Sequence, residues 1–150
     1  MPPGAAVPSV AVGLMQKRGV NLLGHRSMQV DEQLVANAGL VLGMGREHLR
    51  YCVVAFPSAM ERTFTLKEFV RRGRSTPRRD NESLEQWILR LGSGRSMSDF
   101  LGFSRDDDVD DPIGASRRKW RRIIEELEQL TEDTAALLTG NPHADSGPGK

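Results

Sequence analysis

A short apolar run at residues 39–44 is the feature that most constrains the fold of this chain. The run reads GLVLGM, is bounded by glycines, and has helical patterns on both sides. Continuous apolar character over so few residues is typical of a strand buried in a parallel sheet. Helices that alternate with such a strand predict an α/β fold of three layers, in which helices flank a small parallel sheet.

Apolar residues at helical spacing predict helices over most of the remaining chain. Asp31 and Ser116 are suited to cap helix N-termini, while Gly92 and Gly140 are suited to end helices. The helices are expected at residues 7–15, 31–38, 47–54, from 65 onward, 84–91 and 116–139.

A capping box and a second strand are also predicted. Thr65 can accept a hydrogen bond from the backbone near Glu68, while the Glu68 side chain reaches back to Thr65. The second strand is expected at Val53–Phe56, before Pro57. A sheet of so few strands is smaller than an independently stable one usually is, which agrees with a missing beginning.

Three polar segments are predicted to be exposed loops. Residues 71–80 hold five arginines together with Gly73 and Pro77, a pattern too polar and too broken to pack. Residues 93–98 are loop-like, and mutual repulsion is expected to keep the acidic stretch 106–111 exposed. Residues 1–140 are expected to form one domain, and 141–150 a flexible tail with too little apolar content to order itself.

Charge, cysteine and histidine usage limit the partners and the compartment. A net charge of +1, from 21 basic and 20 acidic residues, predicts neither a nucleic-acid nor a membrane partner. The single cysteine, Cys52, cannot form an internal disulfide, which is typical of a reducing compartment, so a cytoplasmic location is expected. His48 and His143 have no partners at metal-ligand spacing, and neither metal nor cofactor is expected.

An Asp-Pro motif is the strongest candidate for chemistry. Asp110 and Asp111 precede Pro112, and the segment leads into the last helix. Proline fixes its own φ and pushes the residue before it toward extended geometry, so Asp111 is held on a stiff turn. A carboxyl group placed there can act as a proton donor, or it can simply complement the dipole of the following helix.

Three further segments precede this motif in order: GHRS at 24–27, LVLGM at 40–44 and FTLKEF at 64–69. Together with the Asp-Pro motif they resemble the low-molecular-weight protein tyrosine phosphatase family. The resemblance implies a doubly wound sheet and hydrolysis of phosphotyrosine by a Cys thiolate and an Asp general acid, which matches Asp111. Many family members place aromatic residues after the Asp-Pro, where this chain has Ile113 and Gly114.

The resemblance also predicts that the N-terminal strand and phosphate loop are missing. The family's nucleophile lies in an N-terminal Cys-x5-Arg loop, and this chain enters the family pattern about one βαβ unit late. Cys52 does not replace it, because the pattern would need Arg where the chain has Ser58. No nucleophile, phosphate-binding or metal-binding residue is therefore assigned, and the chain is predicted to be inactive as it stands.

Three hypotheses follow. The chain can be a phosphatase that, completed upstream, hydrolyses a phosphotyrosine protein or a small phosphomonoester. It can be a non-catalytic binding or regulatory module that docks a protein partner at the exposed sheet edge. The third, an arsenate reductase relative, needs several redox cysteines and this chain has one.

Overall fold

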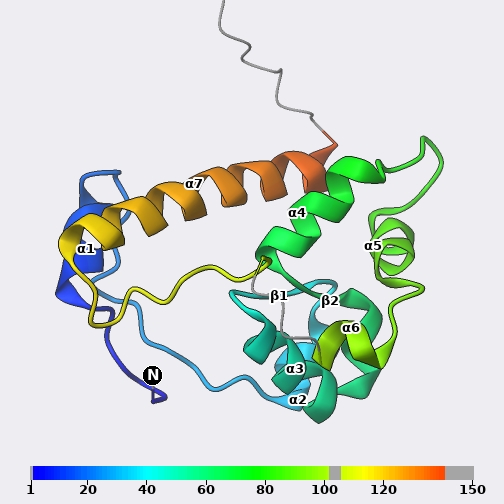
Figure 1. The fold of residues 1–150 in the computed structure, drawn as a ribbon, viewed down its shortest axis with the longest axis horizontal. Coiled ribbons are helices and arrows are strands. Elements are labelled where there is room, and N and C mark those ends of the chain that lie inside the picture. The colour runs from blue at the N-terminus through cyan, green and yellow to red at the C-terminus, as the bar shows by residue number, and fades with distance from the viewer. Residues whose placement is uncertain (1, 102–105, 141–150) are drawn as a thin grey trace, which may run out of the picture.

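The computed structural model describes residues 2–101 and 106–140 (Figure 1). Helices flank a small sheet on both sides, and the long helix α7 lies across one face of the molecule. In chain order the elements are α1 (Ser9–Gln16), α2 (Glu32–Asn37), β1 (Val41–Gly43), α3 (Arg46–Ala55), the 3-10 helix η1 (Pro57–Arg62), β2 (Thr63–Thr65), α4 (Leu66–Ser75), α5 (Leu84–Gly92), α6 (Met97–Leu101) and α7 (Arg117–Thr139).

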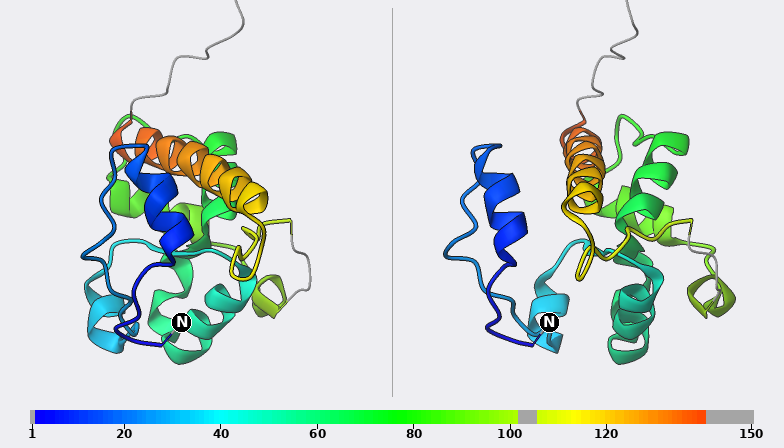
Figure 2. Two further views of the ribbon diagram at one scale, coloured as in Figure 1. Left: turned by 90° about the vertical axis from the view of Figure 1, so that its left-hand side faces the viewer. Right: turned by 60° about the vertical axis from the view of Figure 1, so that its left-hand side comes forward.

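The sheet consists of β1 and β2, which run parallel with Leu42 opposite Phe64. Helix α3 and η1 form the connection between the two strands. The three-layer α/β fold with a small parallel sheet is therefore confirmed. Figure 2 shows α1 beside the first turns of α7, on the side away from α4.

The second strand was predicted at the wrong place. Residues 53–55 belong to α3, and the strand lies at Thr63–Thr65. This strand is hard to recognise in the sequence because two of its three residues, Thr63 and Thr65, are polar. Both threonines are nevertheless buried, and both hydroxyl groups form hydrogen bonds. Thr63 Oγ1 donates to Ala59 O at 2.7 Å, and Thr65 Oγ1 accepts from Glu68 N at 3.1 Å. These local bonds let polar residues occupy a buried strand.

Two apolar clusters hold the layers together. The larger one joins the sheet to the helices α4, α5 and α7, and the smaller one joins α3 to α6. Phe64 is fully buried and connects β2 to the larger cluster. The buried members of the larger cluster are Phe64, Phe69, Trp87, Ile88 and Leu91, and those of the smaller one are Leu49, Val53 and Phe100.

The predicted helix ends are confirmed at several positions. The side chains of Asp31 and Ser116 accept hydrogen bonds from the backbone at the third position of their helices, and Gly140 ends α7 with a φ of 72°. The predicted capping box is only half formed. Thr65 accepts as expected, but the Glu68 carboxylate pairs instead with Arg72 at 2.8 Å and Arg95 at 3.5 Å.

The arginine-rich segment is not a loop at its start, because α4 continues through Ser75. Its cations have partners: Arg72 pairs with Glu68, and Arg74 pairs with Asp133 at 2.7 Å. Gly73 permits a close approach of α4 to α7, since a Cβ there would lie 2.8 Å from Leu137 Cδ1. The glycine that suggested a break instead lies in the packed contact between α4 and α7.

The loop predicted at 93–98 also ends early. Helix α6 begins at Met97, and its Phe100 is 1% exposed, which anchors this helix in the smaller cluster. The predicted tail at 141–150 lies outside the described residues. Among the helices of the described ranges, none has both the length and the apolar character needed to cross a membrane.

Gly92 gives a test of the packing between α5 and η1. A Cβ at this position would lie 1.7 Å from the backbone oxygen of Glu61. Gly92→Ala should therefore lower the free energy of unfolding by at least about 3 kcal/mol, measured by chemical denaturation. Gly13→Ala in α1 is the matched control, because a Cβ there would have no other atom within 4 Å, and a gain of up to about 1 kcal/mol is expected. An unchanged denaturation midpoint for Gly92→Ala would contradict the described packing.

Candidate active site

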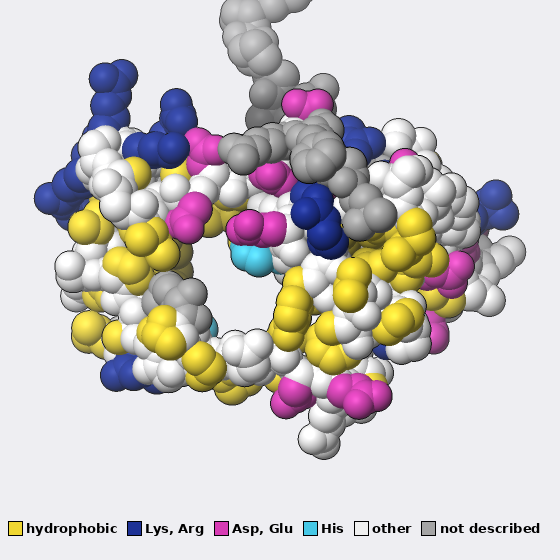
Figure 3. All heavy atoms as spheres, turned by 60° about the horizontal axis from the view of Figure 1, so that its bottom comes forward, with side chains coloured by type: hydrophobic (Ala, Val, Ile, Leu, Met, Phe, Trp, Pro, Cys, Tyr) yellow, Lys and Arg dark blue, Asp and Glu magenta, His cyan; other side chains and the backbone are white. Residues whose placement is uncertain are grey.

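A pocket of about 650 Å³ lies where β1 ends. Three segments line it: the turn and first helical residues after β1, the acidic segment before α7, and one face of α7. Figure 3 shows a wide opening in the molecule, with hydrophobic side chains along much of its rim and acidic and histidine side chains at one edge. The lining residues include Arg46, His48, Asp108, Asp110, Asp111, Ile113 and Trp120.

The acidic segment is docked onto the end of β1. The Val109 N–H donates to Met44 O at 2.7 Å, and Asp108 Oδ1 accepts from Arg46 N at 2.7 Å. Gly45, the N-cap residue of α3, has no side chain that could accept from the free N–H groups at the start of this helix. Asp108, from a distant part of the chain, accepts from one of them. A Cβ on Gly45 would lie 3.3 Å from Asp108 Oδ1, so glycine leaves room for this carboxylate.

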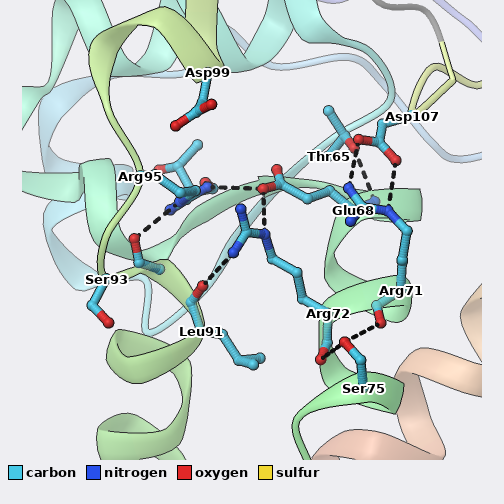
Figure 4. A network of polar contacts seen from close by, with 12 residues as sticks. Thr65, Glu68, Arg71, Arg72, Ser75, Leu91, Ser93, Arg95, Asp99 and Asp107 are labelled. Carbon is cyan, nitrogen blue, oxygen red and sulfur yellow. Dashed lines mark hydrogen bonds and ion pairs between the residues drawn. The ribbon is translucent and has the colours of Figure 1, made fainter.

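Asp107 is the buried anchor of the same segment. It is 7% exposed, and its carboxylate accepts from Arg71 Nη2 at 2.9 Å and lies 3.5 Å from Arg46 Nη2. Figure 4 shows Arg71 and Asp107 facing one another across this contact. The hydrogen bond to Asp107 raises the pKa of Arg71. The expectation that repulsion keeps residues 106–111 exposed is therefore wrong for Asp107, because two guanidinium groups compensate its burial.

The two aspartates before Pro112 have different surroundings. Asp110 Oδ2 lies 3.1 Å from Lys119 Nζ and 3.8 Å from Arg122 Nη2. The hydrogen bond from Lys119 lowers the pKa of Asp110 below the usual range of a carboxyl group. Asp110 is thus held as an anion and tied to α7, which does not suit a proton donor.

Asp111 is exposed and lines the pocket. Its Oδ1 accepts from the Ile113 N–H at 2.9 Å, and the Ala115 N–H donates to Pro112 O at 2.9 Å. These bonds fold residues 111–115 into a tight turn directly before the capped start of α7. The turn thus holds an exposed carboxylate at the pocket.

Two cationic or titratable side chains in the pocket, Arg46 and His48, were not assigned a role from the sequence. Both follow β1 directly, and the carboxyl end of a parallel strand is where α/β folds place their ligand sites. That rule could have identified them. His48 is more than half exposed, and its Nε2 lies 3.8 Å from Glu47 Oε1.

Other residues considered in the sequence lie elsewhere. Arg26 Nη1 donates to the backbone oxygens of Leu23 and His25, so the GHRS segment forms a local turn. Cys52 is buried in α3, and burial raises the pKa of its thiol. A raised pKa disfavours the thiolate that a nucleophile requires. Within the described ranges, no cluster of three or more His, Cys, Asp or Glu side chains could hold a metal ion.

Comparison with known proteins identifies the family. The sequence profile described as "Low molecular weight phosphotyrosine protein phosphatase" matches residues 2–82, more than half of the chain. The chain belongs to this family. The candidate pocket lies at the carboxyl end of β1, where α/β folds in general place their ligand sites.

Related sequences and structures agree with this placement. The chain is 28% identical to protein-arginine-phosphatases of Geobacillus stearothermophilus and Bacillus subtilis, over 83% and 91% of its own length. It spans only 62% and 69% of the length of these relatives. The structure of YwlE arginine phosphatase from Geobacillus stearothermophilus matches with a TM-score of 0.65 and 26% identity, over 97% of this chain and 75% of that one.

A low molecular weight protein tyrosine phosphatase from T. tengcongensis has a similar fold. It matches with a TM-score of 0.63 and 26% identity, over 89% of this chain and 69% of that one. The similar proteins therefore include phosphatases named for arginine and for tyrosine.

Asp107 tests whether the docked segment depends on its buried carboxylate. Asp107→Asn keeps the shape but removes the charge that Arg46 and Arg71 share. Because Arg71 is largely exposed, the expected loss in the free energy of unfolding is only about 1–2 kcal/mol. Hydrogen exchange at the Val109 amide should accelerate, since this N–H bonds to Met44 O.

The matched control is Asp80→Asn, which makes the same change of charge at an exposed position. It should alter stability by less than about 0.5 kcal/mol and leave exchange at Val109 unchanged. Equal effects of the two substitutions would mean that Asp107 does not anchor the segment.

Proposed function

We propose that this chain forms the general-acid side of a low-molecular-weight phosphatase site, with Asp111 as the proton donor to the leaving group. The observation that carries the proposal is the position of Asp111 in a tight turn at the pocket. Asp110 is the neighbouring alternative, but its bond to Lys119 keeps it charged. An exposed carboxyl group on a fixed turn can take up a proton from water between turnovers.

We also propose that the 150-residue chain does not hydrolyse phosphate esters by itself. The reaction needs a thiolate to attack phosphorus and a ring of N–H donors to hold the phosphate oxygens. The chain contains no Cys-x5-Arg sequence, and its one cysteine is buried in α3. General acid catalysis contributes about 10²–10⁴-fold, far less than the total acceleration that phosphate monoesters require.

The substrate proposed is a phosphorylated side chain of a protein. Two relatives carry the name protein-arginine-phosphatase, which supports phosphoarginine beside phosphotyrosine. Ile113, exposed at the pocket, gives this part of the wall an aliphatic surface. Trp120 of α7 lines the same pocket and offers an aromatic surface to a phosphotyrosine ring. The free, buried thiol of Cys52 supports a reducing compartment, such as the cytoplasm, as the place of action.

Hydrolysis of p-nitrophenyl phosphate, a phosphotyrosine peptide and a phosphoarginine peptide tests the proposal. The chain 1–150 should show no turnover, whereas the same chain joined at its N-terminus to a strand and Cys-x5-Arg loop of the family's type should hydrolyse at least one substrate. In the joined protein, Asp111→Asn should lower kcat by about 10²–10⁴-fold and remove the basic limb of the pH profile.

Asp110→Asn is the neighbouring control and should lower kcat far less without changing the shape of the pH profile. A folded but inactive joined protein would refute the assignment of this pocket. Activity in 1–150 alone that is lost in Asp111→Asn would show that a nucleophile exists among residues assigned here to the scaffold.

A second candidate function is a non-catalytic binding or regulatory module, and the free edge of β1 favours it. In the part of the chain that the structure describes, β2 is the only strand paired with β1. The other edge of β1 can pair with an extended segment of a partner protein. Met44, at the end of β1, is 41% exposed and would gain cover from such a partner.

This candidate predicts that the isolated chain is marginally stable. If roughly three or four apolar side chains lack cover, the loss is roughly 5–10 kcal/mol, comparable to the whole stability of an ordinary domain. Calorimetry and sedimentation should show a broad low-temperature transition or self-association. A sharp two-state unfolding transition of a monomer would contradict the need for a partner.

A further inference from the structure

The first turns of α7 carry an unusual concentration of positive charge. Residues 117–122 read RRKWRR, so five of the first six residues are cationic, and the first turn holds no acidic residue. Cations at a helix N-terminus oppose the helix dipole, and stability alone would favour acidic residues there. The sequence of α7 therefore has a charge pattern that folding does not explain.

Most of this charge is not used within the described structure. Lys119 and Arg122 lie near Asp110, but Arg117, Arg118 and Arg121 are exposed and form no ion pair with a described residue. Several arginines elsewhere in the described chain do form ion pairs. Ion pairs bind Arg18 to Glu128, Arg72 to Glu68, Arg74 to Asp133 and Arg90 to Glu82.

The three free arginines belong to the first turns of α7, the helix that lines one side of the candidate active site. Trp120 and Ile123, on the same turns of α7, line the pocket, while Arg117, Arg118 and Arg121 are exposed and do not line it. The turn that holds Asp111 ends directly before this helix. Figure 3 shows Lys and Arg side chains gathered on the side of the molecule where α7 begins.

We propose that Arg117, Arg118 and Arg121 bind acidic side chains that flank the phosphorylated residue of a substrate protein. The inference rests on the proposed function, because the peptide it describes is the substrate of the same pocket. Guanidinium groups bind carboxylates through paired hydrogen bonds and so can select peptides that carry Asp or Glu beside the reacting residue. The three arginines thus determine specificity and take no part in the chemistry.

The surrounding charges favour a short acidic peptide over a nucleic acid. Asp108, Asp110 and Asp111 lie in the pocket beside the arginines and repel a continuous chain of phosphates. The net charge of the whole chain is only +1, which provides no general attraction for a polyanion. A peptide with a few carboxylates can contact the arginines and leave the acidic side of the pocket free.

Binding is measured on the unmodified 150-residue chain by fluorescence anisotropy with a labelled Glu-rich peptide and its Gln counterpart. The Glu peptide should bind at least tenfold more tightly, and added salt should remove the difference because exposed charges are screened. Arg117→Glu/Arg121→Glu should weaken binding of the Glu peptide at least fivefold. The same variant should unfold at an equal or higher temperature, since it improves the charge at the start of α7.

The control is Arg78→Glu/Arg79→Glu, which makes the same change of charge at the other end of α7, where Arg78 lies beside Gly140. The helix places about 34 Å between the two ends, so this variant should bind the Glu peptide like the unmodified chain. Equal weakening in both variants, or no binding by the unmodified chain, would overturn the proposal.

A single-stranded RNA of equal charge that binds more tightly than the Glu peptide would also overturn it, in favour of a nucleic-acid partner. The experiment is independent of catalysis. If the joined protein hydrolyses its substrate but the 150-residue chain does not bind the Glu peptide, this inference alone is refuted. If the chain binds the Glu peptide but the joined protein does not hydrolyse any substrate, the proposed function alone is refuted.

Discussion

The ionic contact of Asp107 with Arg46 and Arg71 determines how the second half of the chain meets the sheet. A carboxylate that is nearly fully buried is tolerated only when cations and hydrogen bonds compensate its lost hydration. Here the two cations come from α3 and α4, so the contact joins three separate parts of the chain. Asp108 completes the attachment by accepting from the N-terminus of α3. The position of the Asp111 turn, and with it the start of α7, follows from this attachment.

On the proposed function, the chain supplies the general-acid side of a low-molecular-weight phosphatase site. The chain presents a carboxyl group at the pocket and exposed arginines on the first turns of α7, while its cysteine is buried in α3. A proton donor and a recognition surface can be built from residues after β1, because the loops at the carboxyl ends of strands meet there. A thiolate with its ring of N–H donors is a separate structural unit, and Cys52 has neither the exposure nor the cationic surroundings to replace it.

Several errors of the sequence-based prediction have a common physical cause. The strand at Thr63–Thr65 was missed because its threonines look polar, although local hydrogen bonds satisfy both hydroxyls. The start of the arginine-rich segment was read as a loop because Gly73 looked like a break, although that glycine admits Leu137 of α7. In both cases a residue that looks unfavourable in isolation is accommodated by a partner. The threonines have hydrogen-bond partners three or four positions away, and Gly73 is packed against a side chain of α7 that is distant in the sequence.

The sequence alone determined the strand β1, most helix ends and the turn at Asp111, because these depend on periodicity and on bonds between residues a few positions apart. The Thr65 cap and the Asp111 turn both close within three residues. Only the tertiary structure decided which aspartate is buried, which one is tied to α7, and which arginines of α7 remain free. Asp108 and Arg46 are 62 positions apart, and Asp107 and Arg71 are 36 apart. Such pairs form only after the layers have packed, so no local pattern can specify them.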